Sequence, residues 1–235
     1  MFDKGQLFVV GTPIGNLEDI TLRAISTLQN VQIILAEDTR NSKKLLDAYN
    51  IDTKMMSYHD HSSEKEIKKI VNLLLEGQDL ALISDAGTPT ISDPGYGIIR
   101  DCIKHDISIV PIPGASSITA AMSVSGLPSD SFTFIGFLPQ KKGRLKKINQ
   151  LKELDNTIIL FESPFRLEKT LNQFYNGHEW VLTKAGKFTD KAALFPNSVF
   201  IIGADTLMRV FDEKFYKNFK DMRDHIQRFL SLIHI

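Results

Sequence analysis

Short runs of apolar residues, each ended by a turn of small or charged residues, mark the first half of the chain. The runs are residues 6–10 (QLFVV), 31–36 (VQIILA), 55–58 (MMSY), 80–83 (LALI) and 107–110 (ISIV). Such runs predict strands, and segments with apolar residues at helical spacing lie between them. The clearest helical face is Ile67, Ile70, Val71, Leu74 and Leu75. Strands that alternate with helices, without an Asn-Gly hairpin in this half, predict a parallel, doubly wound α/β sheet.

The segments between these strands carry helix start signals. Asp19 or Thr21 is suited to cap the first helix, and the expected buried stripe of that helix is Leu22, Ile25 and Leu28. Further helices are expected over residues 42–49, from Ser62 or Ser63 to residue 75, and over residues 98–104 and 118–124.

The pattern changes after residue 128. Residues 131–138 (SFTFIGFL) alternate as a strand of a second sheet, and residues 157–161 (TIILF) predict another strand before a helix. The expected faces of the first of these strands are Phe132, Phe134 and Gly136 on one side, and Thr133, Ile135 and Phe137 on the other. We therefore expect an α/β domain over residues 1–112, an incomplete second α/β domain over residues 113–176, and a divergent tail over residues 177–235.

Loops of small residues follow three of the predicted strands. The most prominent lies within residues 80–97 (LALISDAGTPTISDPGYG), where a buried strand delivers Asp85 and a Gly-rich turn to its carboxyl end. The others are residues 11–16 (GTPIGN) and 113–117 (PGASS). Ligands usually bind at the carboxyl ends of the strands in open α/β sheets. A ligand site is the functional interpretation of these loops, and ordinary connections between strands and helices are the structural alternative.

Charged side chains follow other strands directly. Residues 37–40 (EDTR) come after the second strand, and a role in a site is favoured there over a solvated turn. His59 and His61 lie two residues apart, but no third ligand has a suitable spacing, so a polar site lining or a capping loop is favoured over zinc. Glu162 and Arg166 follow the strand at residues 157–161.

One short segment concentrates positive charge. Residues 141–147 (KKGRLKK) hold five cationic side chains in seven positions. Such a segment is able to contact a polyanion such as a phosphate backbone, and a solvated loop with a helix start is the alternative. On the residues alone, the solvated loop is slightly favoured.

Composition restricts the class and the compartment. With 28 basic and 28 acidic residues the chain has no bulk attraction to nucleic acid, so any attraction must come from a local group. The single Cys102 excludes an internal disulfide or a cysteine-based zinc site and fits a reducing cytoplasm. Neither a secretory leader nor an apolar run of membrane-spanning length is present. We therefore expect a cytoplasmic protein that does not associate with membranes.

Seven motifs, in this order, resemble those of one enzyme family. They are residues 11–17 (GTPIGNL), 37–40 (EDTR), 57–61 (SYHDH), 84–95 (SDAGTPTISDPG), 113–116 (PGAS) with 125–126 (SG), 136–139 (GFLP) and 162–166 (ESPFR). The family is the tetrapyrrole-methylase-type (class III) S-adenosylmethionine methyltransferases, and within it the branch of ribosomal RNA small-subunit methyltransferase I. The resemblance covers roughly residues 6–175.

This resemblance implies a two-domain tetrapyrrole-methylase-like fold, with S-adenosylmethionine bound in the cleft and a homodimer as the usual assembly. It implies 2′-O-methylation of a cytidine ribose in 16S rRNA of the small ribosomal subunit, without a metal. A related enzyme with a tetrapyrrole-like acceptor, or an inactive binding module, is the alternative. The implied cofactor contacts are Pro13, Asp85, Ala86, Gly87, Thr88, Ala115, Ser116 and Ser117.

The remaining motif residues are candidates for catalysis and for RNA binding. The residues that could orient or deprotonate the ribose hydroxyl are Glu37, Asp38, His59 and Glu162. In this interpretation the basic segment becomes an RNA contact, together with two arginines of the motifs. The expected RNA-binding residues are Arg40, Lys141, Lys142, Arg144, Lys146 and Arg166.

The chain departs from the family pattern in two places. Phe165 stands where the family usually has His. Residues 177–235 do not continue the second domain as the family does, and they resemble a fragment of a cytidylyltransferase-like protein, with a strand that ends in residues 203–206 (GADT). A second domain without its last strands is expected to expose apolar surface and a sheet edge.

Overall fold

The computed structural model describes residues 4–59 and 62–174. These residues form two units that divide after residue 120, and each unit is described by itself. The division falls within helix α5 (Ser117–Ser125), eight residues after residue 112, where the sequence predicts the end of the first domain. The predicted tail over residues 177–235, with its resemblance to a cytidylyltransferase, lies outside the described residues.

The first unit is built on a sheet of five parallel strands in the order β3-β2-β4-β1-β5. This order confirms the predicted parallel, doubly wound sheet. Strand β5 begins two residues later than predicted, because Ile107 packs into the core ahead of the paired residues. The strands are β1 (Leu7–Val10), β2 (Ile33–Ala36), β3 (Met55–Ser57), β4 (Leu80–Ile83) and β5 (Ile109–Ile112).

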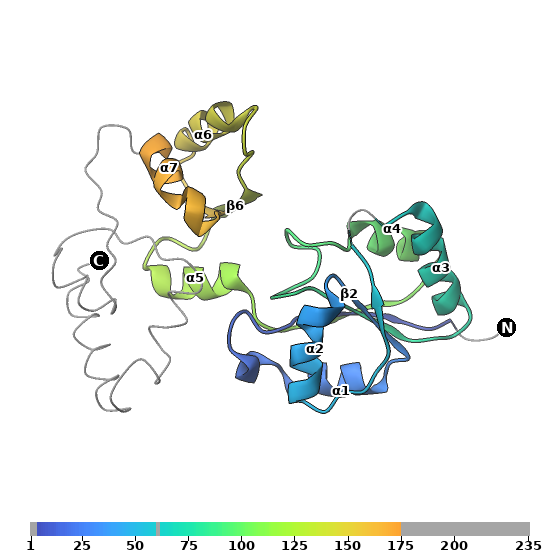
Figure 1. Cartoon of the computed structure of the whole chain (residues 1–235). Helices are drawn as coiled ribbons and strands as arrows, with labels where there is room; N and C mark the ends of the chain where they lie inside the picture. The colour runs from blue at the N-terminus through green and yellow to red at the C-terminus, as the bar shows by residue number, and fades with distance from the viewer. Residues whose placement is uncertain (1–3, 60–61, 175–235) are drawn as a thin grey trace, which may run out of the picture. The chain divides into compact units, whose positions relative to one another are not determined.

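Helices cover both faces of this sheet (Figure 1). Successive residues of each strand point to opposite faces, so the neighbours Ile34 and Leu35 are both fully buried but belong to different core clusters. Full burial of such a side chain stabilises the fold by about 1.5–3 kcal/mol, which is why these strands consist of continuous apolar runs. One face is covered by α1 (Leu22–Asn30) and α2 (Thr39–Ala48), and the other by α3 (Glu64–Leu75) and α4 (Tyr96–Lys104).

Side-chain caps predicted from the sequence fix the start of α1 and of α3. The Thr21 hydroxyl accepts a hydrogen bond from the Ala24 amide at 3.1 Å, at the start of α1. Ser63 and Glu66 form a reciprocal capping box at the start of α3. Of the two candidates predicted for each helix, Thr21 and Ser63 are therefore the caps.

The predicted buried stripe of α1 is wrong at one position. Leu22 is 85% exposed, because it occupies the first helical position and its side chain points away from the sheet. Leu28 is fully buried and Ile25 packs against the core, as predicted, and Ala24 is fully buried in place of Leu22.

The second unit holds two parallel strands and two helices. Ile135, Ile158 and Leu160 of the strands pack with Leu138, Ile148 and Leu151 into one small core cluster. The parallel pair confirms the predicted second sheet. The elements are β6 (Phe132–Phe137), α6 (Arg144–Lys152), β7 (Thr157–Phe161) and α7 (Pro164–Phe174).

A bulge in β6 corrects the predicted faces of this strand. The pairing register shifts between Phe134 and Phe137, where Gly136 takes a positive φ of 69°. The extra residue turns Phe137 to the side of Phe134, and both rings contact Phe161, at centroid distances of 5.5 and 5.1 Å. Phe137 therefore does not share a face with Ile135, which packs into the core cluster.

The single thiol of the chain is buried in the first unit. Burial, with a smaller contribution from the charge of Asp101, raises the pKa of Cys102 to about 11. Cys102 therefore stays protonated at neutral pH and packs as a small apolar side chain. None of the helices in the described part of the chain is long and apolar enough to cross a membrane.

Candidate functional site

Three loops of small residues meet at the carboxyl edge of the first sheet. They follow β4, β1 and β5, which are neighbours in the sheet. The backbones of Thr12 and Gly87 pair with each other, with N–O distances of 2.9 and 3.1 Å. The buried Thr12 hydroxyl lies 3.2 Å from both the Ser84 and the Gly87 carbonyl oxygens. These contacts lock the loop after β1 to the loop after β4.

The loops after β1 and β5 touch through their backbones. A Cβ atom on Gly11 would lie 2.8 Å from the Gly114 Cα, and one on Gly114 would lie 2.7 Å from the Gly11 carbonyl oxygen. Both distances are far shorter than a Cβ atom tolerates next to backbone atoms. Glycine is thus required at both positions for this approach.

A third contact joins the loops after β4 and β5. Gly87 has a φ of +84°, and the Thr88 hydroxyl donates to the Ala115 carbonyl oxygen at 3.5 Å. A Cβ atom on Gly87 would meet the Ile14 side chain at 3.4 Å. The sequence predicts one ligand site from these loops, and the structure does bring all three together.

The predicted cofactor contacts are spread over this loop cluster. Asp85 and Ala86 are exposed, Thr88, Ala115, Ser116 and Ser117 are half-buried, and Pro13 and Gly87 are buried behind them. Small side chains beside glycine leave backbone amide and carbonyl groups within reach of a flat ligand. The donor set and the small side chains fit an adenosyl group.

Titratable residues lie along the same carboxyl edge of the sheet, after the neighbouring strands β4, β2 and β3. The Asp38 amide donates to Asp85 Oδ1 at 3.3 Å, so the strand ends of β2 and β4 touch. Glu37 is half-buried after β2, and His59 is exposed after β3, which pairs with β2. One edge of the sheet thus holds small loops over one part and carboxylates with an imidazole over the other.

Asp38 has a structural role that the sequence does not assign to it. Its carboxylate caps α2 by accepting the Arg40 amide at 2.9 Å, and this hydrogen bond is the main reason that the pKa of Asp38 is lowered. The Arg40 side chain is 91% exposed, and its Nε lies 3.4 Å from the Asp38 carboxylate. Asp38 is therefore a weaker candidate for a base than Glu37 or His59.

The histidine motif is only partly described. The His59 amide donates to the Ser62 hydroxyl at 3.1 Å, in a turn that leads into α3. Asp60 and His61 lie outside the described residues. Over residues 4–59 and 62–174, no group of three or more His, Cys, Asp or Glu side chains could hold a metal ion.

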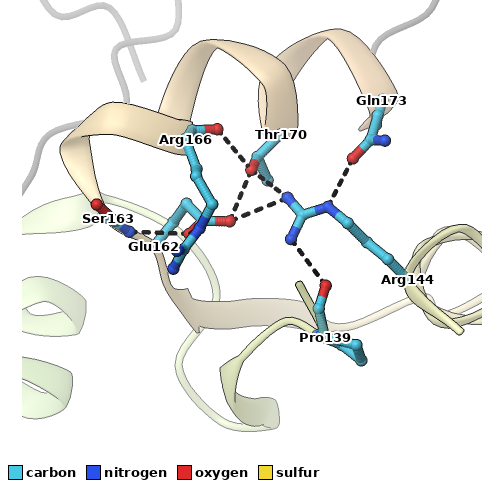
Figure 2. Close-up of polar contacts among 7 residues, drawn as sticks. All are labelled: Pro139, Arg144, Glu162, Ser163, Arg166, Thr170 and Gln173. Atoms are coloured by element: carbon cyan, nitrogen blue, oxygen red, sulfur yellow. Dashed lines mark hydrogen bonds and ion pairs between the residues drawn. The ribbon is translucent and has the colours of Figure 1, made fainter. Parts of the chain in front are cut away.

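The second unit contains a buried ion pair at the tip of β7 (Figure 2). The Glu162 side chain is 4% exposed, and so is that of Arg144. One carboxylate oxygen accepts from Arg144 Nη2 at 2.9 Å and from the Thr170 hydroxyl at 2.8 Å. The other accepts from Arg166 Nε and the Ser163 amide, at 2.8 and 2.9 Å. Every acceptor position of Glu162 is used.

These contacts change the interpretation of Glu162. Burial alone would raise its pKa, but hydrogen bonds from Thr170, Arg144, Arg166 and the Ser163 amide outweigh it and lower the pKa to about 2. A carboxylate with so low a pKa, and with its lone pairs occupied, is a poor proton acceptor at neutral pH. We therefore assign Glu162 a structural role in place of the predicted catalytic one.

Arg144 is also corrected, because it is not part of the exposed basic segment. It is 3% exposed, and its guanidinium contacts the Pro139 carbonyl oxygen and the Gln173 side chain in addition to Glu162 and Thr170. A residue so enclosed is not available to an external phosphate. The other predicted RNA contacts of this segment, Lys141, Lys142 and Lys146, are exposed.

Two partners in this network were not predicted. Thr170 and Gln173 lie on α7, where a single threonine or glutamine gives no signal that distinguishes it from a surface residue. Arg144 did carry a signal, since it has helical spacing with Ile148 and Leu151, which are both buried. That spacing places Arg144 on the inner face of α6.

Comparison with known families covers most of the chain. The model of the family Tetrapyrrole (Corrin/Porphyrin) Methylases matches residues 6–189. The match continues 13 residues into the segment over residues 177–235 that the sequence predicts to be divergent.

Curated relatives with the name ribosomal RNA small subunit methyltransferase I are similar to this chain. The one from Halalkalibacterium halodurans is 52% identical over 171 residues, and the one from Thermotoga maritima is 49% identical over 167 residues. The alignments cover 72% and 71% of this chain. They span 59% of the first relative and 75% of the second, so this chain covers less than two thirds of the Halalkalibacterium protein.

Solved structures with the same fold are methyltransferases. A cobalt precorrin-4 methyltransferase of cobalamin biosynthesis has a TM-score of 0.53 at 21% identity, over 73% of this chain and 74% of that one. A uroporphyrin III C-methyltransferase from Thermus thermophilus has a TM-score of 0.52 at 16% identity, over 74% of this chain and 78% of that one. At this identity the likeness shows the fold alone, and it agrees with the fold that the motifs imply.

Proposed function

The chain belongs to the tetrapyrrole methylase family, and on this premise we propose that it transfers a methyl group from S-adenosylmethionine to a ribose 2′-hydroxyl of a cytidine in small-subunit ribosomal RNA. The observation that carries the proposal is the cluster of three loops at the carboxyl edge of β4, β1 and β5, locked by the Thr12–Gly87 pairing. The name shared by the similar relatives supports the RNA substrate.

The loop cluster supplies the cofactor site in this proposal. The backbones around Gly87 and Ala115 hold the adenosyl group, and Asp85 is placed to accept hydrogen bonds from a ligand hydroxyl or amine. When bound, S-adenosylmethionine supplies a methyl group on a positively charged sulfur. The loops are held in place before binding by their mutual contacts, so little ordering free energy is spent on closing them.

In this proposal, residues that follow β2 and β3 orient and deprotonate the ribose hydroxyl. The hydroxyl must be aligned, and it would lose one proton as the new C–O bond forms and the bond from the methyl carbon to sulfur breaks, which leaves S-adenosylhomocysteine. Glu37 and His59 stand at the same sheet edge as the cofactor loops and are the proton acceptors we propose. Asp38 is committed to the helix cap, and Glu162 is committed to the buried ion pair.

Charged groups of both units contact the RNA backbone in this proposal. Arg40 is exposed after β2, and Lys141, Lys142 and Lys146 are exposed in the second unit. Arg166 is 34% exposed, with its Nε held by Glu162, so its terminal nitrogens are the part that a phosphate can contact. A homodimeric assembly and a cytoplasmic location stay predictions from the sequence.

The test is a methyl-transfer assay with the full chain, S-adenosylmethionine labelled in the methyl group, and small ribosomal subunits. We expect label in the RNA, in a nucleotide whose 3′ linkage resists alkaline hydrolysis because its 2′-hydroxyl is methylated. Glu37→Gln and His59→Ala should each lower the rate while S-adenosylhomocysteine still binds. Label in a base of the RNA would contradict the proposal. So would a parallel assay in which uroporphyrinogen is methylated but the RNA is not.

A further inference from the structure

A groove lies between the outer faces of α6 and α7 in the second unit. Its volume is about 620 Å³. Leu145, Asn149 and Lys152 line it from α6, and Phe165, Lys169 and Asn172 line it from α7. Within each helix these residues are separated by four and then three positions, which places them on one helical face. The groove is thus a regular feature of the two packed helices.

Polar contacts and core packing join the two helices beneath this groove. Arg144 Nε donates to Gln173 Oε1 at 2.8 Å and ties the start of α6 to the end of α7. Below the helices, Arg144 also contacts Glu162, while Ile148 and Leu151 are buried in the core cluster. These contacts join the two helices whose side chains line the groove.

Phe165, one of the residues that line the groove, presents its aromatic ring to solvent. Phe165 is 98% exposed, and Leu145 on the facing helix is 60% exposed. A phenylalanine so exposed gains nothing for folding from its apolar surface. An exposed aromatic face is, however, the platform on which an unstacked base of single-stranded nucleic acid lies.

The charges around the groove are mostly positive. Between residues 121 and 174 the chain has 8 basic and 5 acidic residues. Within this unit, the ion pairs of the described residues involve Arg144 and Arg166, so none of them neutralises a lysine. Lys152 and Lys169 lie in the groove beside one carboxylate, that of Glu168, and Lys141, Lys142 and Lys146 precede or flank it on α6. The net charge favours a polyanion over a protein partner.

We propose that the groove between α6 and α7 binds single-stranded RNA, with one base stacked on Phe165 and the adjacent phosphates on Lys152 and Lys169. The proposal rests on the proposed function, because it names a contact of the same RNA substrate away from the reacting ribose. Its amide side chains, Asn149 and Asn172, offer hydrogen bonds to a base edge or a sugar.

The test is fluorescence anisotropy of the full chain with a fluorescein-labelled, twelve-nucleotide oligocytidylate, at several salt concentrations. Phe165→Ala should weaken binding by roughly fivefold or more, the effect typical of a lost base–aromatic stack. The Lys152→Glu/Lys169→Glu variant should bind more weakly and reduce the slope of log K against log salt by about 1.4, as expected for two lost phosphate contacts. Lys68→Glu/Lys69→Glu, on the exposed side of α3, is the control with the same charge change.

Two further measurements make the result unambiguous. Phe165→Tyr keeps the aromatic ring and should bind within twofold of the wild-type chain. Titration of each variant with S-adenosylhomocysteine reports on the cofactor site separately, so a chain that binds RNA but no cofactor would overturn the proposed function and leave the groove supported. Affinity for the oligonucleotide that is equal in the groove variants and the α3 control would overturn the groove proposal.

Discussion

The two units of the chain build their candidate sites from different parts of the polypeptide. In the first unit the loops contact one another mainly through backbone atoms, at Thr12, Gly87, Gly11 and Gly114. In the second unit, the segments are joined by charged and polar side chains around the Arg144–Glu162 pair. Residues 4–120 hold 11 basic and 15 acidic residues, whereas residues 121–174 hold 8 basic and 5 acidic ones. The contrast separates the cofactor site that we propose for the first unit from the RNA-binding surface that we propose for the second.

This difference determines which kind of substitution is harmful. A backbone-built site is disrupted when atoms are added, because a new Cβ atom pushes two loops apart. A side-chain network is disrupted when a charged group is removed, because its partner then stays buried and unpaired. The predictions below test this distinction, from the largest expected effect to the smallest.

Removal of one partner of the buried pair should have the largest effect. Arg144→Met leaves Glu162 buried without its main cation, and we expect the second unit to lose about 3–5 kcal/mol of stability. Hydrogen exchange measured by mass spectrometry would locate the loss, since peptides from β6 to α7 should exchange faster while those of the first sheet stay protected. The double variant Arg144→Met/Glu162→Leu should lose less stability than Arg144→Met alone. Equal losses of stability would contradict the pairing of these two side chains.

Acid should destabilise the second unit more than the first. The pKa of Glu162 is lowered to about 2 from its ordinary 4.5. Its interactions therefore contribute full stability above about pH 4.5, and this contribution is lost as the pH falls from there towards 2. Among the carboxylates of the first unit with a lowered pKa, Asp38 is half-buried and Glu66 is exposed, so their contribution to stability is smaller than that of the buried Glu162 side chain.

The measurement is hydrogen exchange of each unit at a series of pH values, corrected for the intrinsic dependence of the amide exchange rate on pH. The second unit should open first on acidification, and Glu162→Gln should remove that extra sensitivity. Simultaneous opening of both units in the wild-type chain would show that the pair does not control the acid response.

A polar contact within the loop cluster should have an intermediate effect. Thr12→Val keeps the shape of the side chain but removes the hydroxyl that lies 3.2 Å from the Ser84 and Gly87 carbonyl oxygens. We expect a loss of about 1–3 kcal/mol in the stability of the first unit, the usual effect of removing the donor from a buried hydrogen bond, since the Gly87 carbonyl oxygen keeps the Thr12 amide but the Ser84 carbonyl oxygen loses the hydroxyl. Urea unfolding followed by circular dichroism would measure it, and Thr12→Ser should retain most of the stability.

Loss of the cap of α2 should have the smallest effect. Asp38→Ala removes the acceptor for the Arg40 amide and should cost about 1 kcal/mol. Asp38→Asn preserves a capping acceptor and should cost less. If Asp38 were instead the catalytic base, Asp38→Asn would abolish methyl transfer while the stability stayed near that of the wild-type chain.

The fold and the loop cluster could largely be predicted from the sequence, because they depend on local patterns. The buried strands β2 and β4 consist of apolar runs, and parallel strands bring their carboxyl ends to one edge. The seven ordered motifs also predicted the tetrapyrrole methylase family, and the match of the family model to residues 6–189 confirms this prediction.

The errors occurred where a local pattern was overridden by packing. Arg144 stands in a run of cations that suggests exposure, but the helix that begins there turns it inward. Phe137 follows the alternation of a strand, but the bulge at Gly136 changes its side. Leu22 has the right spacing for a core position but occupies the first position of its helix. The outcomes for Arg144 and Phe137 depend on contacts with residues far apart in the sequence, Glu162 and Phe161, whereas that for Leu22 depends on where its helix begins.

The central claim is that the three loops of the first unit form the cofactor site, and one calorimetric titration tests it most directly. The full chain is titrated with S-adenosylhomocysteine, alongside Gly11→Ala, whose Cβ atom would lie 2.8 Å from the Gly114 Cα. We predict saturable binding by the wild-type chain and at least a tenfold weaker affinity for the variant, because the loops after β1 and β5 are pushed apart. Equal binding by both, or no binding by a folded wild-type chain, would contradict the claim.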